Sequence, residues 1–267
     1  MREIRLYDSL TGQLVPVSAG DAIRVEVRNS PNGSDGGVDV ASTRPLVLFS
    51  FLERFLQREG FGTKFLFDSP TGEDMLYELS EGEEEPLRAP DSGDYDHDYD
   101  DYDHDAEMSL LEVSRSDVDR WVNVCFGAGR DGERWEAVSP DERVLLSDAL
   151  ERFGHQAVAL YLLGTHYSLP LGDASTGLAT GSKNAVRIRE AAKTLVPDQP
   201  SPPDMRHYME AFRDALANDL DTPLAFVVMF EWVLEAERRG GDVGDSDLRV
   251  MLEVLELDSL AAPVGAT

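Results

Sequence analysis

The order strand, helix, strand between residues 22 and 68 restricts the fold of this chain more than any other feature. "AIRVEV" (22–27) alternates apolar and polar residues as a half-buried strand does, and "TKFLFD" (63–68) is a second strand. The intervening "LVLFSFLERFLQREG" ends at Gly60 and places five apolar residues on one helical face: Leu46, Phe49, Leu52, Phe55 and Leu56. A βαβ unit pairs its strands in parallel, so we predict an α/β fold in which helices cover a parallel sheet.

Shorter patterns add elements on both sides of this unit. The stretch "IRLYDSLTGQLVPV" (4–17) predicts two short strands around a Thr-Gly turn, and "MSLLEV" (108–113) and "VNVCF" (122–126) predict two more. Ser139 as a cap and Pro140 in the first turn predict the start of a helix, and "HQAVALYLL" predicts the next one.

From about residue 182 onward the apolar spacing is helical only. The predicted helices lie in "SKNAVRIREAAKTL", "PDMRHYMEAFRDALAND", "TPLAFVVMFEWVLEAERRGG" and "SDLRVMLEVLEL". The third of these has Thr222 as its cap, Pro223 in its first turn and glycine at its end. We therefore expect an α/β domain followed by an all-α helical bundle.

Residues 80–107 interrupt these patterns with an acidic segment. Residues 81–107 hold thirteen acids and one base, which predicts a disordered insert. Within it, "DYDHDYDDYDHD" (94–105) combines oxygen and imidazole ligands, so a specific metal site, loose cation association and a solvated spacer are all open. We favour the spacer, because the run has neither a glycine turn nor an apolar anchor to hold a geometry. The expected division is 1–79 and 108–172 for the two halves of the α/β domain, 80–107 for the insert and 173–267 for the bundle.

The formal net charge of −28 limits the kinds of partner. The chain has only three lysines against 21 arginines, and its acids are dispersed over the whole sequence. Such a surface is expected of a protein from concentrated salt, where self-repulsion is screened within about 3 Å at 1 M. It argues against strong nucleic-acid binding at ordinary ionic strength, although a local basic strip is compatible with it.

Cysteine content and hydropathy bear on the compartment. Cys125 is the single cysteine, so the chain contains neither a disulfide framework nor a thiolate zinc site of its own. No apolar run approaches the roughly 18 residues that a membrane helix needs, and charged residues follow Met1 directly. We expect a cytoplasmic protein.

Four separated stretches resemble the cysteinyl-tRNA synthetases, which are class I aminoacyl-tRNA synthetases. They are "REIRLYDSLTGQLVPV", "FLERFLQREGFGTKFLFDSPTGEDML", "YLLGTHYSLPLGD" and "YMEAFRDALANDLDTPLAFVVMFEWVLEAER", in the family's order along the chain. The resemblance implies a reduced, Rossmann-like domain of the class I type followed by a helical, tRNA-binding-type domain. It also implies a structural role at the domain junction for Thr165, His166 and Tyr167.

The positions of the family's catalytic motifs carry other residues. The His-x-Gly-His element that contacts ATP corresponds to Asp39, Val40, Ala41 and Ser42, and a carboxylate facing a triphosphate is repulsive. The Lys-Met-Ser-Lys-Ser element corresponds to "RDGERWEAVSPDE" (130–142), in which Arg134 keeps one positive charge. Ser30 stands near the place of a zinc-binding cysteine, and the middle section with the other zinc ligands is missing. ATP and zinc are thus expected of the family, but the chain lacks the motifs for both, and we assign no cofactor, metal ligand or catalytic residue.

These departures predict a non-catalytic binding or regulatory relative of the synthetases, with tRNA or another translation protein as partner. The basic strip of Lys183, Arg187, Arg189 and Lys193 lies in the region that contacts RNA in the family, and a solvated helix face is the other interpretation. The alternative function is a diverged ATP-dependent cysteine-tRNA ligase or related amino-acid ligase, including one whose missing parts come from another chain. The oligomeric state is left open.

Overall fold

The computed structural model of the chain describes residues 2–18, 21–27, 38–61, 64–68, 120–126 and 143–260. Several predictions lie outside these residues: the acidic insert 80–107, the strand at 108–113, and the assignments of Ser30 and Arg134. Within the described part the fold is mixed α/β, with a small sheet and seven α-helices.

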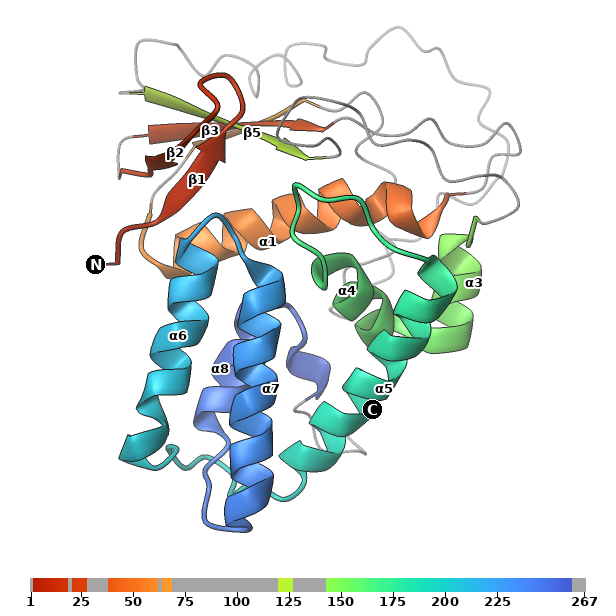
Figure 1. Ribbon diagram of the computed structural model, residues 1–267, viewed down its shortest axis with the longest axis vertical. Helices are drawn as coiled ribbons and strands as arrows, with labels where there is room; N and C mark the ends of the chain where they lie inside the picture. Colours follow the sequence, from red (N-terminus) through yellow and green to blue (C-terminus); the bar gives the residue numbers. More distant parts are fainter. Residues whose placement is uncertain are drawn as a thin grey trace, which may run out of the picture.

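A three-stranded parallel sheet forms one layer of the molecule. Strand β3 (Asp21–Val27) pairs in parallel with β4 (Lys64–Asp68) on one side and with β5 (Arg120–Phe126) on the other, giving the order β4-β3-β5. Helix α1 (Arg44–Arg58) connects β3 to β4, so the predicted βαβ unit is confirmed. Figure 1 shows α1 lying between this sheet and the helices of the C-terminal half.

Helix α1 ends where the sequence predicts. Gly60 has a φ of 83°, a left-handed conformation that glycine adopts without steric cost. The N–H of Phe61 donates to the carbonyl of Leu56 at 2.9 Å, and that of Gly60 donates to Gln57 at 3.1 Å. This is a Schellman cap, and the buried side chains of Phe61 and Leu56 supply its hydrophobic contact.

A two-stranded antiparallel hairpin, β1 (Arg5–Asp8) and β2 (Gln13–Pro16), flanks the sheet as predicted. The Asp8 carboxylate accepts hydrogen bonds from the N–H groups of Thr11 at 2.8 Å and Asn123 at 3.1 Å. Burial raises the pKa of Asp8, but these hydrogen bonds outweigh burial and hold the pKa below its usual value. The same carboxylate therefore shapes the hairpin turn and ties the hairpin to β5.

The helix predicted to begin at Pro140 begins later. Helix α3 spans Leu146–Phe153, and its N-cap is Leu145. Leu145 forms an antiparallel bridge with Asp39, and the N–H of Leu146 donates to the carbonyl of Val38 at 2.8 Å. The prediction was wrong because residues 143–145 use their backbone groups to pair with residues 38–40, which helical geometry would prevent.

Five helices follow: α4 (His155–Leu163), α5 (Ala174–Ala192), α6 (Arg206–Ala217), α7 (Thr222–Arg239) and α8 (Ser246–Val254). Helix α5 begins eight residues before the predicted start, because Asp173 caps it by accepting from the N–H of Thr176 at 2.7 Å. The cap of α7 is Asp221, which accepts from the N–H of Leu224 at 3.0 Å, and not Thr222 as predicted. The hydroxyl of Thr222 instead donates to the carbonyl of Leu163 at 2.6 Å. No helix in the described residues is long and apolar enough to cross a membrane.

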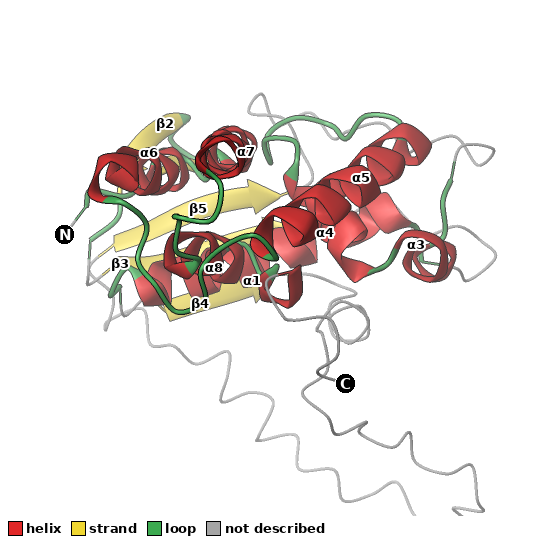
Figure 2. Cartoon of the chain, turned by 90° about the horizontal axis from the view of Figure 1, so that it is seen from below, coloured by secondary structure: helices red, strands yellow, loops and turns green. Residues whose placement is uncertain are grey.

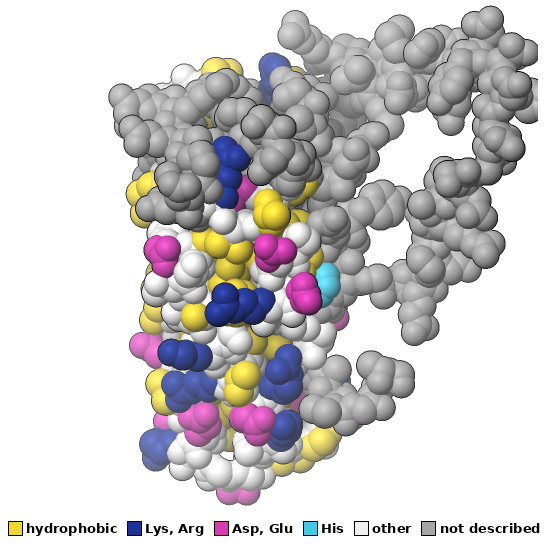
Figure 3. Space-filling view, turned by 90° about the vertical axis from the view of Figure 1, so that its right-hand side faces the viewer, with side chains coloured by type: hydrophobic (Ala, Val, Ile, Leu, Met, Phe, Trp, Pro, Cys, Tyr) yellow, Lys and Arg dark blue, Asp and Glu magenta, His cyan; other side chains and the backbone are white. Residues whose placement is uncertain are grey.

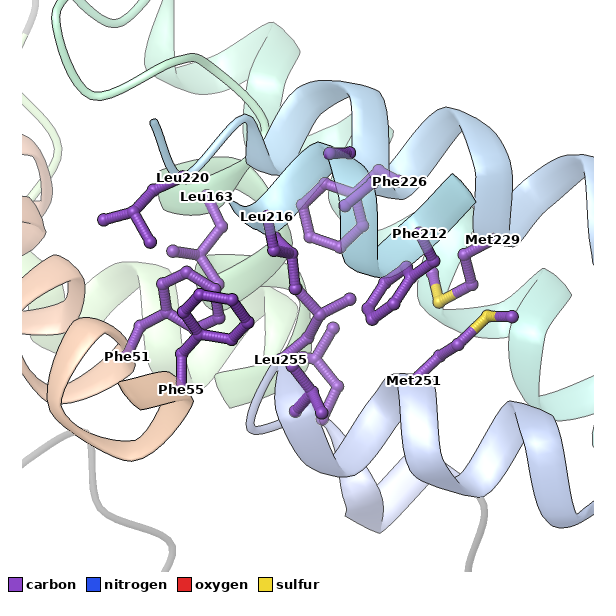
Figure 4. Close-up of a cluster of buried hydrophobic side chains, with 14 of the residues drawn as sticks. Phe51, Phe55, Leu163, Phe212, Leu216, Leu220, Phe226, Met229, Met251 and Leu255 are labelled. Atoms are coloured by element: carbon purple, nitrogen blue, oxygen red, sulfur yellow. The ribbon is translucent and has the colours of Figure 1, made fainter. Parts of the chain in front are cut away.

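One continuous apolar core joins the sheet to the C-terminal helices. Phe51 and Phe55 of α1 point toward Leu216 of α6, and Met229 of α7 meets Met251 of α8 (Figure 4). Seen from below, α6 and α7 lie on one side of α8 and α1 (Figure 2). Within the described residues, α6, α7 and α8 therefore share the main core with the sheet, and a second, smaller apolar cluster lies between α3, α4 and α5.

Helices α4 and α5 pack closely through two glycines of α5, one against the backbone of α4 and one against a side chain. A Cβ atom at Gly181 would overlap the carbonyl oxygen of Ala157, and one at Gly177 would overlap the ring of Tyr161. Because a backbone carbonyl cannot move aside as a flexible side chain can, Gly181 sets how closely the two helices approach.

Replacement of Gly181 by alanine tests this contact. In an exposed helix such a change stabilises by about 1 kcal/mol, but here overpacking is expected to destabilise by about 1–3 kcal/mol. The free energy of unfolding in urea measures the difference. Gly172→Ala is the matched control, because no atom lies within 4 Å of the added Cβ. Equal stability of the two variants would contradict the close contact.

Candidate functional site

A fully buried arginine holds the segment that connects α4 to α5. We call residues 164–169 the junction loop. The Arg44 guanidinium donates from Nε to the carbonyl of Leu162 at 3.0 Å and from Nη1 to Leu169 at 2.6 Å. Its Nη2 donates to His166 at 2.9 Å and also to Thr165. One side chain from the first turn of α1 thus satisfies carbonyls at the end of α4 and along the junction loop.

Electrostatics accounts for a cation at this position. The last carbonyls of a helix have no intrahelical donor and carry partial negative charge, so they favour a positive group. Burial lowers the pKa of Arg44 to about 10, and the guanidinium stays charged at neutral pH. Its planar fork reaches several carbonyls at once, which a lysine ammonium could not do in the same space.

Asp219 holds the junction loop from the opposite side. Its Oδ1 accepts from the hydroxyl of Tyr167 at 2.5 Å and from the N–H of Tyr7 in β1 at 2.8 Å. Its own N–H donates to the carbonyl of Arg5 at 2.8 Å. Asp219 has a φ of 61° and Leu220 a φ of 52°, a conformation that costs roughly 1–2 kcal/mol for each non-glycine residue. The turn between α6 and α7 is therefore strained in the geometry that binds β1 to the junction.

His166 completes this junction. Its Nδ1 accepts from the N–H of Ser168 at 3.3 Å, which assigns the proton to Nε2, and Nε2 donates to the carbonyl of Asp219 at 3.1 Å. Serine, histidine and aspartate are the residue types of a nucleophilic triad, but the carboxylate oxygen nearest to Nε2 lies 3.7 Å away. The carboxylate is bound instead to Tyr7 and Tyr167, so the arrangement is that of a structural contact.

The structure thus places Thr165, His166 and Tyr167 against two charged residues that the sequence analysis did not single out, Arg44 and Asp219. In the sequence, Asp219 is only one residue of the stretch 208–238 that resembles the synthetases. Arg44 follows two residues after Ser42 and belongs to no motif.

The turn that corresponds to the ATP-binding element is filled by the chain itself. Asp39 precedes a 3-10 turn, Val40–Thr43, that leads directly into α1. The hydroxyl of Ser42 donates to the carbonyl of Asp39 at 2.6 Å, and the hydroxyl of Thr43 donates to that of Val40 at 2.7 Å. The N–H of Val40 donates to the carbonyl of Val144 at 2.9 Å. These three donors point at the protein backbone, so they are not directed toward a bound phosphate.

The charge at this turn also opposes an anion. Burial raises the pKa of Asp39, against a partial lowering by the backbone N–H groups of Ser42, Ala41 and Val144. Burial likewise raises the pKa of Tyr161 to about 12, with the neighbouring Asp39 acting in the same direction. The hydroxyl of Tyr161 donates to the carbonyl of Gly172 at 2.9 Å. No three His, Cys, Asp or Glu side chains within the described ranges could hold a metal ion together.

Three of the four basic residues of the strip lie on α5 and the fourth, Lys193, is its C-cap residue, but ion pairs divide them. Arg187 pairs with Glu237 of α7 at 3.0 Å, and Lys193 pairs with Glu190 at 2.7 Å. Lys183 and Arg189 have no ion pair with any described residue. Residues 174–197 contain four bases and one acid, a net charge of +3 in a chain of −28. Figure 3 shows lysine and arginine side chains on this side of the molecule, interspersed with acidic side chains and exposed apolar atoms.

Known proteins match parts of this chain. The cysteine-tRNA ligase of Parvibaculum lavamentivorans is 32% identical over 130 residues, which is 46% of this chain and 28% of that protein. The cysteine-tRNA ligase of Azotobacter vinelandii is 28% identical over 146 residues, which is 54% of this chain and 30% of that protein. The resemblance seen in the sequence is confirmed at the level of this family, and the chain spans less than a third of the length of these two relatives.

No family model matches the chain. Among solved structures, the ternary complex of the Agrobacterium radiobacter K84 agnB2 LeuRS with tRNA and LeuAMS aligns with 56% of this chain and 24% of that one. The TM-score is 0.40 and the sequence identity is 15%, and similarity at that level does not establish a shared fold.

Arg44→Met tests the role of the buried guanidinium. The variant keeps the volume but leaves several buried carbonyls without a donor, each costing about 1–3 kcal/mol, so we expect a loss of about 3 kcal/mol or more. Urea unfolding monitored by circular dichroism measures it. Arg58→Met on the same helix removes a partly exposed ion pair with Glu253 and should cost less than about 1 kcal/mol. An equal loss of unfolding free energy in the two variants would contradict the stabilising role assigned to Arg44.

Asp39→Asn tests the half-buried Asp39 carboxylate through the pH dependence of stability. Because the folded-state pKa is raised, the folded chain binds this proton more tightly than the unfolded chain, and stability falls as pH rises through the folded pKa. We expect the asparagine variant to be more stable than the parent at pH 7, with the gain vanishing below about pH 4. Hydrogen bonds from the Thr176 hydroxyl and N–H lower the pKa of Asp173, so Asp173→Asn should destabilise at pH 7. A stability difference for Asp39→Asn that is independent of pH would contradict this account of the carboxylate.

Proposed function

We propose that this chain is a non-catalytic relative of the cysteine-tRNA ligases that binds tRNA through α5. It would act as a binding or regulatory protein of translation in the cytoplasm, without ATP or zinc. The relatives are named as ligases, but this chain covers less than a third of the length of the two quoted above. Sequence similarity over that part does not imply that this chain has ligase activity.

One observation supports the non-catalytic part of the proposal. The hydrogen-bond donors of the turn at Asp39–Thr43 are already bound to acceptors of the protein. A phosphate site at the start of a helix depends on N–H and hydroxyl groups that point at the ligand. Here the N–H of Val40 is bound to Val144, and the hydroxyl of Ser42 is bound to Asp39. A triphosphate would have to displace these contacts and also overcome the Asp39 carboxylate.

The architecture supports a reduced domain of the class I synthetase type. Strands β3 and β4 with α1 form the parallel unit from which such Rossmann-like domains are built, and α6, α7 and α8 pack as a helical bundle would. We retain 1–79 and 108–172 as the two halves of this domain, 80–107 as an insert and 173–267 as the bundle. The shared core makes the bundle dependent on the sheet half for stability.

The charge distribution favours α5 as the RNA contact. Phosphate neutralisation by lysine and arginine supplies most of the non-specific affinity for nucleic acid. Residues 174–197 have a net charge of +3, whereas the chain as a whole would repel RNA. Lys183 and Arg189 are the stronger candidates, because Arg187 and Lys193 already face carboxylates.

A second candidate function is a diverged ATP-dependent ligase, and the identity of 32% to a cysteine-tRNA ligase favours it. This function requires ATP to bind. Saturation with ATP and magnesium at 100 times the Kd would stabilise the fold by about 2.7 kcal/mol. A thermal shift of that size would support the ligase, and its absence supports the binding protein.

The RNA proposal predicts a specific effect of charge removal. Lys183→Ala with Arg189→Ala should weaken binding of fluorescently labelled tRNA and reduce the slope of log K against log salt concentration by roughly 1–2. Fluorescence anisotropy titrations at several salt concentrations measure both quantities. Arg249→Ala is the matched control, since Arg249 lies on α8 and pairs with Asp245.

Two outcomes would overturn the proposal. Unchanged affinity and slope in the double variant would exclude α5 as the contact. Absence of tRNA binding by the unmodified chain at low salt would reject tRNA as the partner.

A further inference from the structure

The outward face of α7 carries an apolar stripe that the RNA proposal does not use. Leu224, Val227 and Leu234 are 46%, 52% and 48% exposed, although large apolar side chains on helices normally face the core. Together with Glu231 they follow the spacing i, i+3, i+7, i+10, which places all four on one side of the helix. We call these four residues the α7 stripe.

The stripe is continuous with half-buried apolar surface. Phe230, between Val227 and Leu234 on the flank of the stripe, packs against the core and is only partly covered. Figure 2 shows α7 at the outer edge of the helices, with α8 and α1 on its inner side and no described element over its outer side. Single exposed aliphatic residues are common on protein surfaces, whereas an aligned row of them marks a contact surface.

Charge at the stripe points to the chemistry of the occupant. Glu235 and Glu237 on the same helix are each paired with an arginine, at 2.6 Å from Arg238 and 3.0 Å from Arg187. Glu231 lies within the stripe and has no ion pair with any described residue. A lysine or arginine of a bound partner could form an ion pair with Glu231, as arginines of this chain do with Glu235 and Glu237. The net charge of −28 would also attract a basic partner.

Charge disfavours a second copy of this chain. From Leu224 to Leu234 the helix rises about 15 Å, which matches three turns of a docked helix. Two chains of −28 would repel each other, and their Glu231 carboxylates would approach across the interface.

We propose that the α7 stripe binds a basic amphipathic helix of another protein. Its aliphatic residues would pack on Leu224, Val227 and Leu234, and a lysine or arginine would pair with Glu231. This mode of recognition, an amphipathic helix laid on a complementary apolar face, uses aliphatic anchors at i, i+3 or i+4, and i+7. The stripe consists of other residues than the basic strip to which the RNA contact is assigned, although Glu237 of α7 pairs with Arg187 of α5.

Binding of a defined peptide to the full chain tests the proposal. The probe is a fluorescein-labelled 16-residue peptide with leucines on one helical face and lysines on the other. A scrambled peptide of the same composition and a version with glutamate in place of lysine are the peptide controls. Fluorescence anisotropy measures the affinity, and hydrogen exchange maps the protected residues.

The expected result is binding of the basic amphipathic peptide with protection of residues 224–234. Val227→Ser with Leu234→Ser should weaken this binding at least about tenfold, because aliphatic anchors dominate such contacts. Glu231→Lys should reverse the preference toward the acidic peptide. Leu14→Ser, which removes an exposed leucine from β2 (44% exposed), is the matched control and should bind as the parent does.

Any of four results would overturn the proposal. These are no binding of the basic peptide, equal binding of the scrambled peptide, unchanged binding by the stripe variants at an unchanged urea midpoint, and a stripe-dependent dimer in sedimentation velocity. Loss of tRNA binding in the stripe variants would assign the face to RNA instead. Because Lys183→Ala with Arg189→Ala should leave peptide binding intact, failure of the RNA proposal and failure of this one are distinguishable.

Discussion

The buried guanidinium of Arg44 is the interaction on which the rest of the structure depends. It extends from the first turn of α1 and binds carbonyls at the end of α4 and along the junction loop. Asp219 holds the same loop from the other side through Tyr167 and ties it to β1 through Tyr7. The sheet half and the helical half are thereby fixed to each other by two charged residues that are both buried. Removal of either would leave polar groups without partners in the core, which is more costly than loss of an exposed ion pair.

This scaffold also determines what its candidate site can bind. The turn before Arg44 lies where the resemblance to cysteinyl-tRNA synthetases would place the ATP contacts. Pairing between residues 38–40 and 143–146 uses the N–H of Val40, and Ser42 uses its N–H and its hydroxyl within the turn. Under the function proposed above, the scaffold is kept without a phosphate site that can receive ATP, and α5 and α7 are the surfaces proposed to contact partners.

Local patterns predicted the elements whose causes are local. The alternation in β3, the apolar face of α1 and the stop at Gly60 are properties of a few neighbouring residues, and the structure confirms all three. The start of α3 was predicted wrongly, because its backbone pairs with a segment more than 100 residues away. The cap of α7 shifted by one residue because the hydroxyl of Thr222 finds a distant acceptor in Leu163. Arg44 and Asp219 escaped notice for the same reason, since their partners are contributed by other elements. For the four bases of α5, the sequence located the strip but could not predict that Glu190 and Glu237 would pair with two of them.

The central claim is that the synthetase scaffold persists here without the chemistry of amino-acid activation. Cysteine-dependent exchange of pyrophosphate into ATP tests it most directly, measured on the purified chain at low salt and at molar salt. Because the donors of the turn are already bound to protein groups and the half-buried Asp39 carboxylate lies there, we predict a rate equal to that of a blank without protein under both conditions. Exchange well above the blank that depends on cysteine would contradict the claim and would make the chain a ligase.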